Sequence, residues 1–154
     1  DFNNIDYTYL GDDKSLKDLK EKYSYAAICI GQIKSHIPRL NIYNKIINLK
    51  FNLPNFISKN TILSSKSTLG ISNFIMSNVF LNRNVNVGNN NIINTGSIIE
   101  HDSTIGNNCH ISTGSIINGN VTIEDNVFIG SGSVVYHNTT IKKNSIIPAG
   151  TIIR

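Results

Sequence analysis

Residues 97–133 read SIIEHDSTIGNNCHISTGSIINGNVTIEDNVFIGSGS and repeat one pattern, an aliphatic residue at every sixth position with a mostly small residue four places after it. The aliphatic position continues without exception over residues 57–154. Its members are Ile57, Leu63, Leu69, Ile75, Leu81, Val87, Ile93, Ile99, Ile105, Ile111, Ile117, Ile123, Ile129, Val135, Ile141, Ile147 and Ile153. One hexapeptide cannot bury its aliphatic side chain alone, but three make a triangular coil, and coils stacked at about 4.8 Å bury a continuous column. The register therefore predicts a mainly β chain, a parallel β-helix of about five coils.

A second period, three times as long, supports the triangular coil. Gly96, Gly114, Gly132 and Gly150 recur once in every three hexapeptides, each followed by Ser or Thr. Glycine at one corner of the prism is expected where the backbone needs a positive φ, or where a ligand approaches the main chain closely.

The charged residues divide the chain into two parts. Residues 1–56 carry 14 of the 24 Asp, Glu, Lys and Arg side chains, although they are the shorter part. Within them, residues 16–23 have helical spacing, residues 25–31 form an apolar run typical of a buried strand, and a second helix is expected after Pro38. We expect residues 1–56 to be the remnant of an α/β domain and residues 57–154 to be the β-helix. Because one strand cannot form a sheet, we also expect a missing segment upstream of Asp1.

Composition excludes several classes of protein. A net charge of +4 without Lys/Arg clusters is not typical of a nucleic-acid binder. Two cysteines, Cys29 and Cys109, make no disulfide framework and fit a reducing compartment. No signal peptide or membrane-spanning run is apparent, so we expect a cytoplasmic protein that is not bound to a membrane.

The register also identifies side chains that point outward. Glu100, His101 and Asp102 occupy three consecutive outward positions, so His101 is predicted on the surface. Such a histidine is often only solvated, but a neighbouring carboxylate can orient the ring and stabilise its protonated form, as a general base requires. His110 ends the next hexapeptide and is also predicted outside the core.

Three segments resemble a known family. Residues 27–46 (AICIGQIKSHIPRLNIYNKI), 53–63 (LPNFISKNTIL) and 97–133 are similar to the sialic acid O-acetyltransferases and UDP-4-amino-sugar N-acetyltransferases, which are left-handed β-helix acyltransferases. This resemblance implies a left-handed helix, a Rossmann-like start, a homotrimer with sites between adjacent prisms, and acetyl-CoA as co-substrate. It also implies a segment missing before residue 1 and a further one after Arg154.

The resemblance assigns roles to individual residues. It implies His101 as the catalytic base and Asp102, where many members have Glu, as the carboxylate that raises its basicity. Three acetyl-CoA contacts, His110, Ser131 and Ala149, follow from it, although small outward residues also suit a subunit contact. It further implies that Gly31 and Gln32 contact the nucleotide sugar.

The function expected is acetyl transfer to the amino group of a nucleotide-linked amino-deoxy sugar in surface-glycan synthesis. O-acetylation of a sialic acid remains open, as do a non-catalytic scaffold or ice-binding prism and a fragment that binds CoA without turnover. No metal is expected, because His101 and His137 lie two coils apart, about 10 Å, too far to share an ion as in β-helix carbonic anhydrases. Ice-binding surfaces need repeated paired threonines, and Thr139 and Thr140 look isolated in the sequence.

Overall fold

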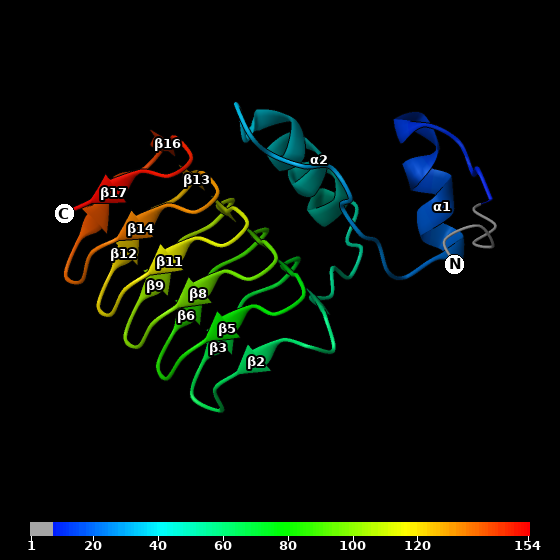
Figure 1. Ribbon diagram of the computed structural model, residues 1–154. Coiled ribbons are helices and arrows are strands. Elements are labelled where there is room, and N and C mark those ends of the chain that lie inside the picture. The colour runs from blue at the N-terminus through cyan, green and yellow to red at the C-terminus, as the bar shows by residue number, and fades with distance from the viewer. Residues whose placement is uncertain (1–7) are drawn as a thin grey trace.

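The computed structural model describes residues 8–154 as a triangular β-helix with a small helical cap (Figure 1). The cap contains a short 3-10 helix (η2, Asp13–Ser15), α1 (Leu16–Lys22) and α2 (Ile37–Asn48). Both α-helices lie where the sequence predicts them. Pro38 occupies the first turn of α2, where its missing N–H is not needed.

Seventeen two-residue strands make three parallel sheets, one on each face of the prism. Sheet 1 contains β1 (Phe56–Ile57), β4 (Phe74–Ile75), β7 (Ile92–Ile93), β10 (His110–Ile111), β13 (Phe128–Ile129) and β16 (Ile146–Ile147). Sheet 2 contains β2 (Ile62–Leu63), β5 (Phe80–Leu81), β8 (Ile98–Ile99), β11 (Ile116–Ile117), β14 (Val134–Val135) and β17 (Ile152–Ile153). Sheet 3 contains β3 (Thr68–Leu69), β6 (Asn86–Val87), β9 (Thr104–Ile105), β12 (Thr122–Ile123) and β15 (Thr140–Ile141). Each strand pairs with the strand three hexapeptides away, as Ile116 with Ile98 and Thr122 with Thr104, which confirms the triangular coil.

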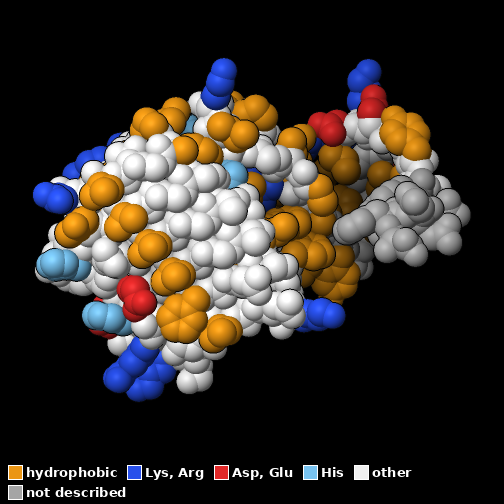
Figure 2. All heavy atoms as spheres, in the orientation of Figure 1, with side chains coloured by type: hydrophobic (Ala, Val, Ile, Leu, Met, Phe, Trp, Pro, Cys, Tyr) orange, Lys and Arg blue, Asp and Glu red, His pale blue; other side chains and the backbone are white. Residues whose placement is uncertain are grey.

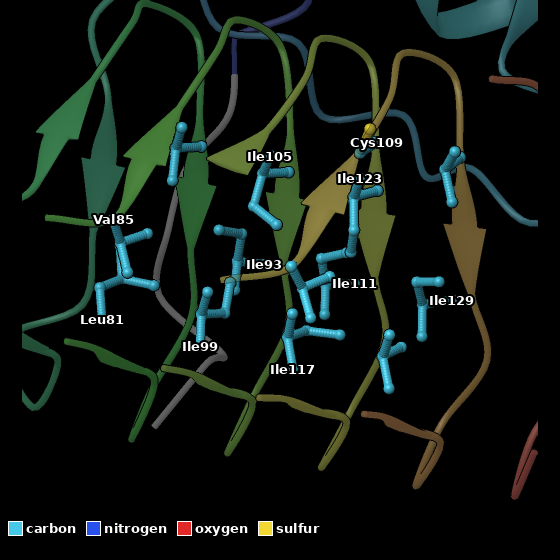
Figure 3. Close-up of a cluster of buried hydrophobic side chains, with 14 of the residues drawn as sticks. Leu81, Val85, Ile93, Ile99, Ile105, Cys109, Ile111, Ile117, Ile123 and Ile129 are labelled. Carbon is cyan, nitrogen blue, oxygen red and sulfur yellow. The ribbon is translucent and has the colours of Figure 1, made fainter. Parts of the chain in front are cut away.

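The second residue of every strand points into the prism and is the aliphatic residue of the repeat. Ile93, Ile99, Ile105, Ile111, Ile117, Ile123 and Ile129 have no more than 1% of their surface exposed. Figure 3 shows these side chains stacked along the axis. The positions four places later are also inward, and six of them are buried polar residues, namely Asn73, Asn91, Ser97, Ser103, Ser115 and Ser133. The asparagine amides and the serine hydroxyls hydrogen-bond to backbone atoms of neighbouring coils, so each of these buried polar side chains has a partner.

The three corners of the prism are defined by a left-handed backbone conformation at every sixth residue. Corner 1–2, between sheets 1 and 2, has Asn78, Gly96, Gly114, Gly132 and Gly150 at this position. Corner 2–3 has Asn84, Asp102, Asn120 and Asn138, and corner 3–1 has Ser72, Asn90, Asn108, Asn126 and Asn144. Glycine, Asn and Asp are the residues that adopt this conformation at least cost, which explains the glycine period.

The apolar run over residues 25–31 is not a buried strand, so this prediction is wrong. Within residues 8–154 it pairs through a single bridge between Tyr25 and Asn52, and of its apolar side chains only Ile28 is buried. The Arg39 guanidinium instead binds the carbonyls of Ile28 and Ile30, at 2.6 and 2.8 Å. In the part of the chain that the structure describes, no second strand pairs with this segment, which is an arm held by a side chain of α2.

The cap covers the middle of sheet 1, and the outward residues at its two ends, Phe56 and Ile146, remain exposed. In Figure 1, α2 lies between α1 and the prism. Arg39 is 1% exposed, and its guanidinium carbon lies 5.4 Å from the centre of the Phe74 ring on β4. Ile28, Ile46, Phe51 and Leu53 form a separate small core inside the cap. Sheet 1 is therefore the covered face of the prism.

The outward columns of sheets 2 and 3 differ in chemistry. Sheet 2 presents only apolar residues, Ile62, Phe80, Ile98, Ile116, Val134 and Ile152, and Figure 2 shows them as a row across the prism surface. Sheet 3 presents Thr68, Asn86, Thr104, Thr122 and Thr140. Thr140 is thus one of a column and not isolated, but the column is a single row rather than the paired rows expected of an ice-binding surface.

Candidate active site

His101 and Asp102 lie at corner 2–3, in the turn between β8 and β9. His101 is exposed, as predicted, and its Nδ1 lies 2.8 Å from an Asp102 carboxylate oxygen. Neighbouring side chains of a strand point to opposite faces, but Asp102 has a φ of 60° and the chain turns here. The shorter Asp side chain therefore reaches the ring of the preceding residue.

This hydrogen bond determines which nitrogen of the His101 ring can accept a proton. When Nδ1 donates its proton to the carboxylate, Nε2 has a free lone pair and can accept a proton. The second Asp102 oxygen accepts a 2.8 Å hydrogen bond from the Asn84 side-chain amide, one coil away. Hydrogen bonds from Asn84 and then from His101 hold the pKa of the Asp102 carboxyl below its ordinary value, so the partner of His101 is a carboxylate at neutral pH.

Asn84 was not predicted as a site residue. It precedes Asp102 by one full coil and so occupies the same corner in the adjacent coil. The signal that identifies it is this three-hexapeptide spacing, which the glycine column also shows.

His110 lies outside the prism core, as expected, but most of its side chain is buried. The arm of the cap crosses β10 and leaves the residue 7% exposed, with Nδ1 hydrogen-bonded to the Gln32 carbonyl. Its Nε2 lies 3.3 Å from the Asn94 amide, and the ring meets Phe128 edge-on at 5.3 Å. The sequence register correctly separates inward from outward side chains, but it cannot show that another part of the chain covers sheet 1.

Gln32 and Gly31 lie on this same covered face. Gln32 is 3% exposed and donates a 2.7 Å hydrogen bond to the Asn108 carbonyl at corner 3–1, whereas Gly31 is exposed. A cleft of about 150 Å³ lies beside them, between residues 32–36 of the arm and strands β13 and β16. Its lining combines the amides of Asn126 and Asn144 with the ring of Phe128.

Ser131 and Ala149 lie at corner 1–2, along the edge of sheet 1. Both are exposed and occupy adjacent coils, joined by the 2.9 Å hydrogen bond from the Gly150 N–H to the Ser131 carbonyl. The Ser131 hydroxyl is also 2.8 Å from that of Ser112, which follows β10. At Gly132 and Gly150 an added Cβ would meet nothing within 4 Å, so this edge is open to a ligand.

The predicted site residues thus form two groups in one chain. The first group lies on or over sheet 1: His110, Ser131 and Ala149 lie on the sheet or its edge, and Gly31 and Gln32 lie in the arm that crosses it. His101 and Asp102 lie at corner 2–3. Sheet 1 does not border that corner, because a triangular prism has one corner opposite each face. The two groups therefore cannot meet around one ligand within a single copy.

Metal ligation finds no support in the part of the chain that the structure describes. Among residues 8–154, no three His, Cys, Asp or Glu side chains are placed to share an ion. In the same residues, no helix is long and apolar enough to cross a bilayer.

Comparison with known proteins places this geometry in a family. The family model "Bacterial transferase hexapeptide (six repeats)" matches residues 120–154, while a search of curated proteins finds no match. Among solved structures, PerB from Caulobacter crescentus in complex with CoA and GDP-perosamine is 30% identical. The match has a TM-score of 0.89 and covers 94% of this chain and 69% of PerB. This chain belongs to the hexapeptide β-helix acyltransferases.

Two further solved structures are similar to this chain. A mutant of perosamine N-acetyltransferase from Caulobacter crescentus, in complex with CoA and GDP-perosamine, is 28% identical with a TM-score of 0.88, covering 94% of this chain and 68% of that one. The acetyltransferase domain of PglB from Neisseria gonorrhoeae, in complex with acetyl coenzyme A, is 20% identical with a TM-score of 0.84, covering 98% of this chain and 77% of that one. The PglB match shows a shared fold. This acyltransferase therefore has its family's β-helix, with an exposed His–Asp pair at corner 2–3.

Burial of His110 predicts a specific pH dependence of this acyltransferase's stability. Desolvation is the main cause that lowers the pKa of His110 below its ordinary value of 6.5; the Gln32 carbonyl opposes it and Arg39 adds to it. The unfolded chain then binds this proton more readily than the folded chain, so this contribution to stability is complete above pH 6.5. It is lost progressively as the pH falls below 6.5 and through the lower pKa of His110 in the folded chain.

Urea unfolding at about pH 7.5 and 5.5 checks this expectation. The wild-type midpoint should fall more between these two conditions than the midpoint of His110→Gln, which cannot titrate there. Equal decreases in the two proteins would mean that burial of His110 is not linked to stability.

Proposed function

We propose that this chain transfers the acetyl group of acetyl-CoA to the amino group of a nucleotide-linked amino-deoxy sugar in surface-glycan synthesis. The observation that carries the proposal is the hydrogen-bonded His101–Asp102 pair with its free Nε2, placed on the prism of an acyltransferase. The similarity of this chain to two solved structures that hold CoA and GDP-perosamine supports the choice of substrates. Both cysteines are free, which agrees with a reaction in the cytoplasm.

The reaction needs one base and one carboxylate. His101 Nε2 accepts a proton from the amino group as the nitrogen attacks the thioester carbonyl carbon. The C–N bond forms, the C–S bond breaks, and the imidazolium then returns its proton to the departing CoA sulfur. Asp102 orients the ring and stabilises the imidazolium, which is the role of a carboxylate beside a general base.

The active site in this proposal is shared between copies. His101 and Asp102 come from corner 2–3 of one prism, and sheet 1 of its neighbour brings His110, with Ser131 and Ala149 along the open edge, to acetyl-CoA. The apolar column of sheet 2 supports such an assembly, because its side chains, exposed at both ends and half-buried between, form a continuous apolar row that favours burial against another subunit. We propose a homotrimer, the smallest ring in which each copy gives a corner to one neighbour and a face to the other.

Residues 1–56 hold the acceptor in this proposal. The exposed backbone at Gly31 and the cleft beside Gln32 supply polar groups and the Phe128 ring, which together match the hydroxyls and the apolar face of a sugar. His110 is hydrogen-bonded to the Gln32 carbonyl, so in this proposal the acceptor and the thioester of acetyl-CoA both bind next to Gln32.

An acceptor assay tests this function. The protein is incubated with acetyl-CoA and either GDP-perosamine, a GDP-hexose with a hydroxyl in place of the amino group, or a free sialic acid, and CoA release and product mass are followed. We expect acetylation of GDP-perosamine and none of the hydroxyl analogue. Acetylation of sialic acid alone would reassign the chain to O-acetyl transfer. No turnover, with no acetyl-CoA binding by calorimetry at millimolar concentration, would support a non-catalytic prism.

A further inference from the structure

At corner 2–3, four successive coils each contribute two consecutive residues, and these pairs lie on top of one another. The pairs are Arg83–Asn84, His101–Asp102, Gly119–Asn120 and His137–Asn138. Backbone hydrogen bonds join successive coils there, from Asp102 N–H to the Arg83 carbonyl at 3.0 Å and from Asn120 N–H to the His101 carbonyl at 2.9 Å. The next coil follows at 3.2 Å, from Asn138 N–H to the Gly119 carbonyl. His101 and Asp102 are therefore held between one coil that carries Asn84 and another that carries Gly119.

Gly119 lies directly against the His101 ring. A Cβ added at Gly119 would be 2.7 Å from Cε1, 2.8 Å from Nε2 and 3.2 Å from Nδ1 of that ring. These distances are well below an ordinary contact of about 3.5 Å between heavy atoms. Gly119 is not among the glycines with positive φ, so its backbone conformation does not itself exclude alanine. The ring of His101, and not the main chain, is what a side chain at this position would displace.

Asn84 acts on the same pair from the opposite side. Its amide binds the Asp102 oxygen that His101 does not use, so the carboxylate is held at both oxygens. The side chains of His101 and Asp102 are 59% and 51% exposed, and exposed side chains otherwise sample several rotamers. Asn84 and Gly119 limit the rotamers of Asp102 and His101, as surrounding side chains would do in a buried site.

We infer that Asn84 and Gly119 are positioning residues for the proposed base: Asn84 fixes the Asp102 carboxylate, and Gly119 leaves the space in which the His101 ring lies. This inference rests on the proposed function, because it assigns their effect to acetyl transfer. Neither residue needs to touch a substrate.

Gly119→Ala tests the space above the ring. The clashing atoms belong to an exposed side chain that can swing into solvent, so the fold should tolerate the methyl group and the melting temperature should stay unchanged. A displacement of the base by about 1 Å costs on the order of 10²-fold in rate, so kcat should fall by about that factor while KM for acetyl-CoA is retained. In a His101→Gln background the same change should have no further effect on the residual rate.

Asn84→Gly tests the support of the carboxylate. Glycine keeps the positive φ at this corner, and Asn138→Gly is the matched control, because Asn138 has nearly the same φ (58° against 59°) in the same column. Among residues 8–154 its side chain hydrogen-bonds to Asn120 and not to the His101–Asp102 pair. We expect a lower kcat in Asn84→Gly and an unchanged one in Asn138→Gly. Long-range ¹H–¹⁵N spectra should show the Nδ1–H tautomer of His101 in wild type and in Asn138→Gly, and a loss of that single tautomer in Asn84→Gly and in Gly119→Ala.

The outcomes separate this inference from the proposed function. If His101→Gln loses activity while Gly119→Ala and Asn84→Gly keep the wild-type kcat and the wild-type spectrum, the positioning roles are wrong and the proposed base stands. If His101→Gln is fully active, His101 is not the base, whereas the spectra still show whether the two neighbours hold the ring. If the wild-type protein transfers no acetyl group in the acceptor assay, the proposed function fails independently of these variants.

Discussion

Replacement of His101 by glutamine is expected to lower kcat for acetyl transfer by about 10² to 10⁴-fold, the usual contribution of a general base. Glutamine keeps a polar side chain of similar length at the corner but cannot accept the proton of the attacking amine at neutral pH. Because the His101 side chain is 59% exposed and packs against no core residue, the melting temperature should not change. Steady-state kinetics and thermal unfolding of the same preparation measure both quantities.

His137→Gln is the matched control for that experiment. His137 occupies the same corner position two coils further along and is exposed. Within residues 8–154 it has no carboxylate partner; its ring is tilted against that of Tyr136 at 6.4 Å. We expect His137→Gln to keep the wild-type kcat. Wild-type turnover by His101→Gln, or an equal loss in the two variants, would contradict the assignment of the base.

The prism could be predicted from the sequence because its determinants are local and periodic. Each hexapeptide places one aliphatic residue inward, and each corner needs a residue that accepts positive φ. Gly96 and Gly114 reveal corner 1–2 directly in the sequence. Asp102 at corner 2–3 and Asn108 at corner 3–1 do not stand out in the sequence in the same way. The same register correctly placed His101 on the surface.

The covered face could not be predicted in the same way. Burial of His110 depends on Gln32, which lies far earlier in the chain, and no repeat links the two. The arm was mistaken for a strand because an apolar run does not show whether a partner strand exists. Arg39 replaces that partner for two carbonyls, a contact that depends on how α2 packs against sheet 1.

Asn84 and Gly119, the neighbours of the His101–Asp102 pair, could be predicted from the sequence only in part. Asn84 lies one coil before Asp102 and Gly119 one coil after His101, so the coil length predicts that they are adjacent in space. It does not predict that an amide of Asn84 binds the carboxylate, or that the ring lies against Gly119. Those contacts depend on rotamers that the repeat leaves open.

We also expect the two halves of the proposed active site, corner 2–3 and the edge of sheet 1, to come from different copies of the chain. His101→Gln removes the base at corner 2–3, and Ala149→Trp fills the open edge of sheet 1 without entering the core, because Ala149 is exposed. Each variant alone should be inactive. If every site takes its corner from one copy and its edge from another, a mixed oligomer contains sites in which both contributions are intact.

The measurement is the acetyl-transfer rate after the two inactive variants are co-expressed in equal amounts. We predict recovery of about a quarter of the wild-type rate, because each site draws independently on two neighbouring copies. His101→Gln mixed with Asp102→Gly is the control and should stay inactive, since both changes damage the same corner. Absence of recovery in the first mixture, from oligomers shown to contain both variants, would contradict a site shared between copies.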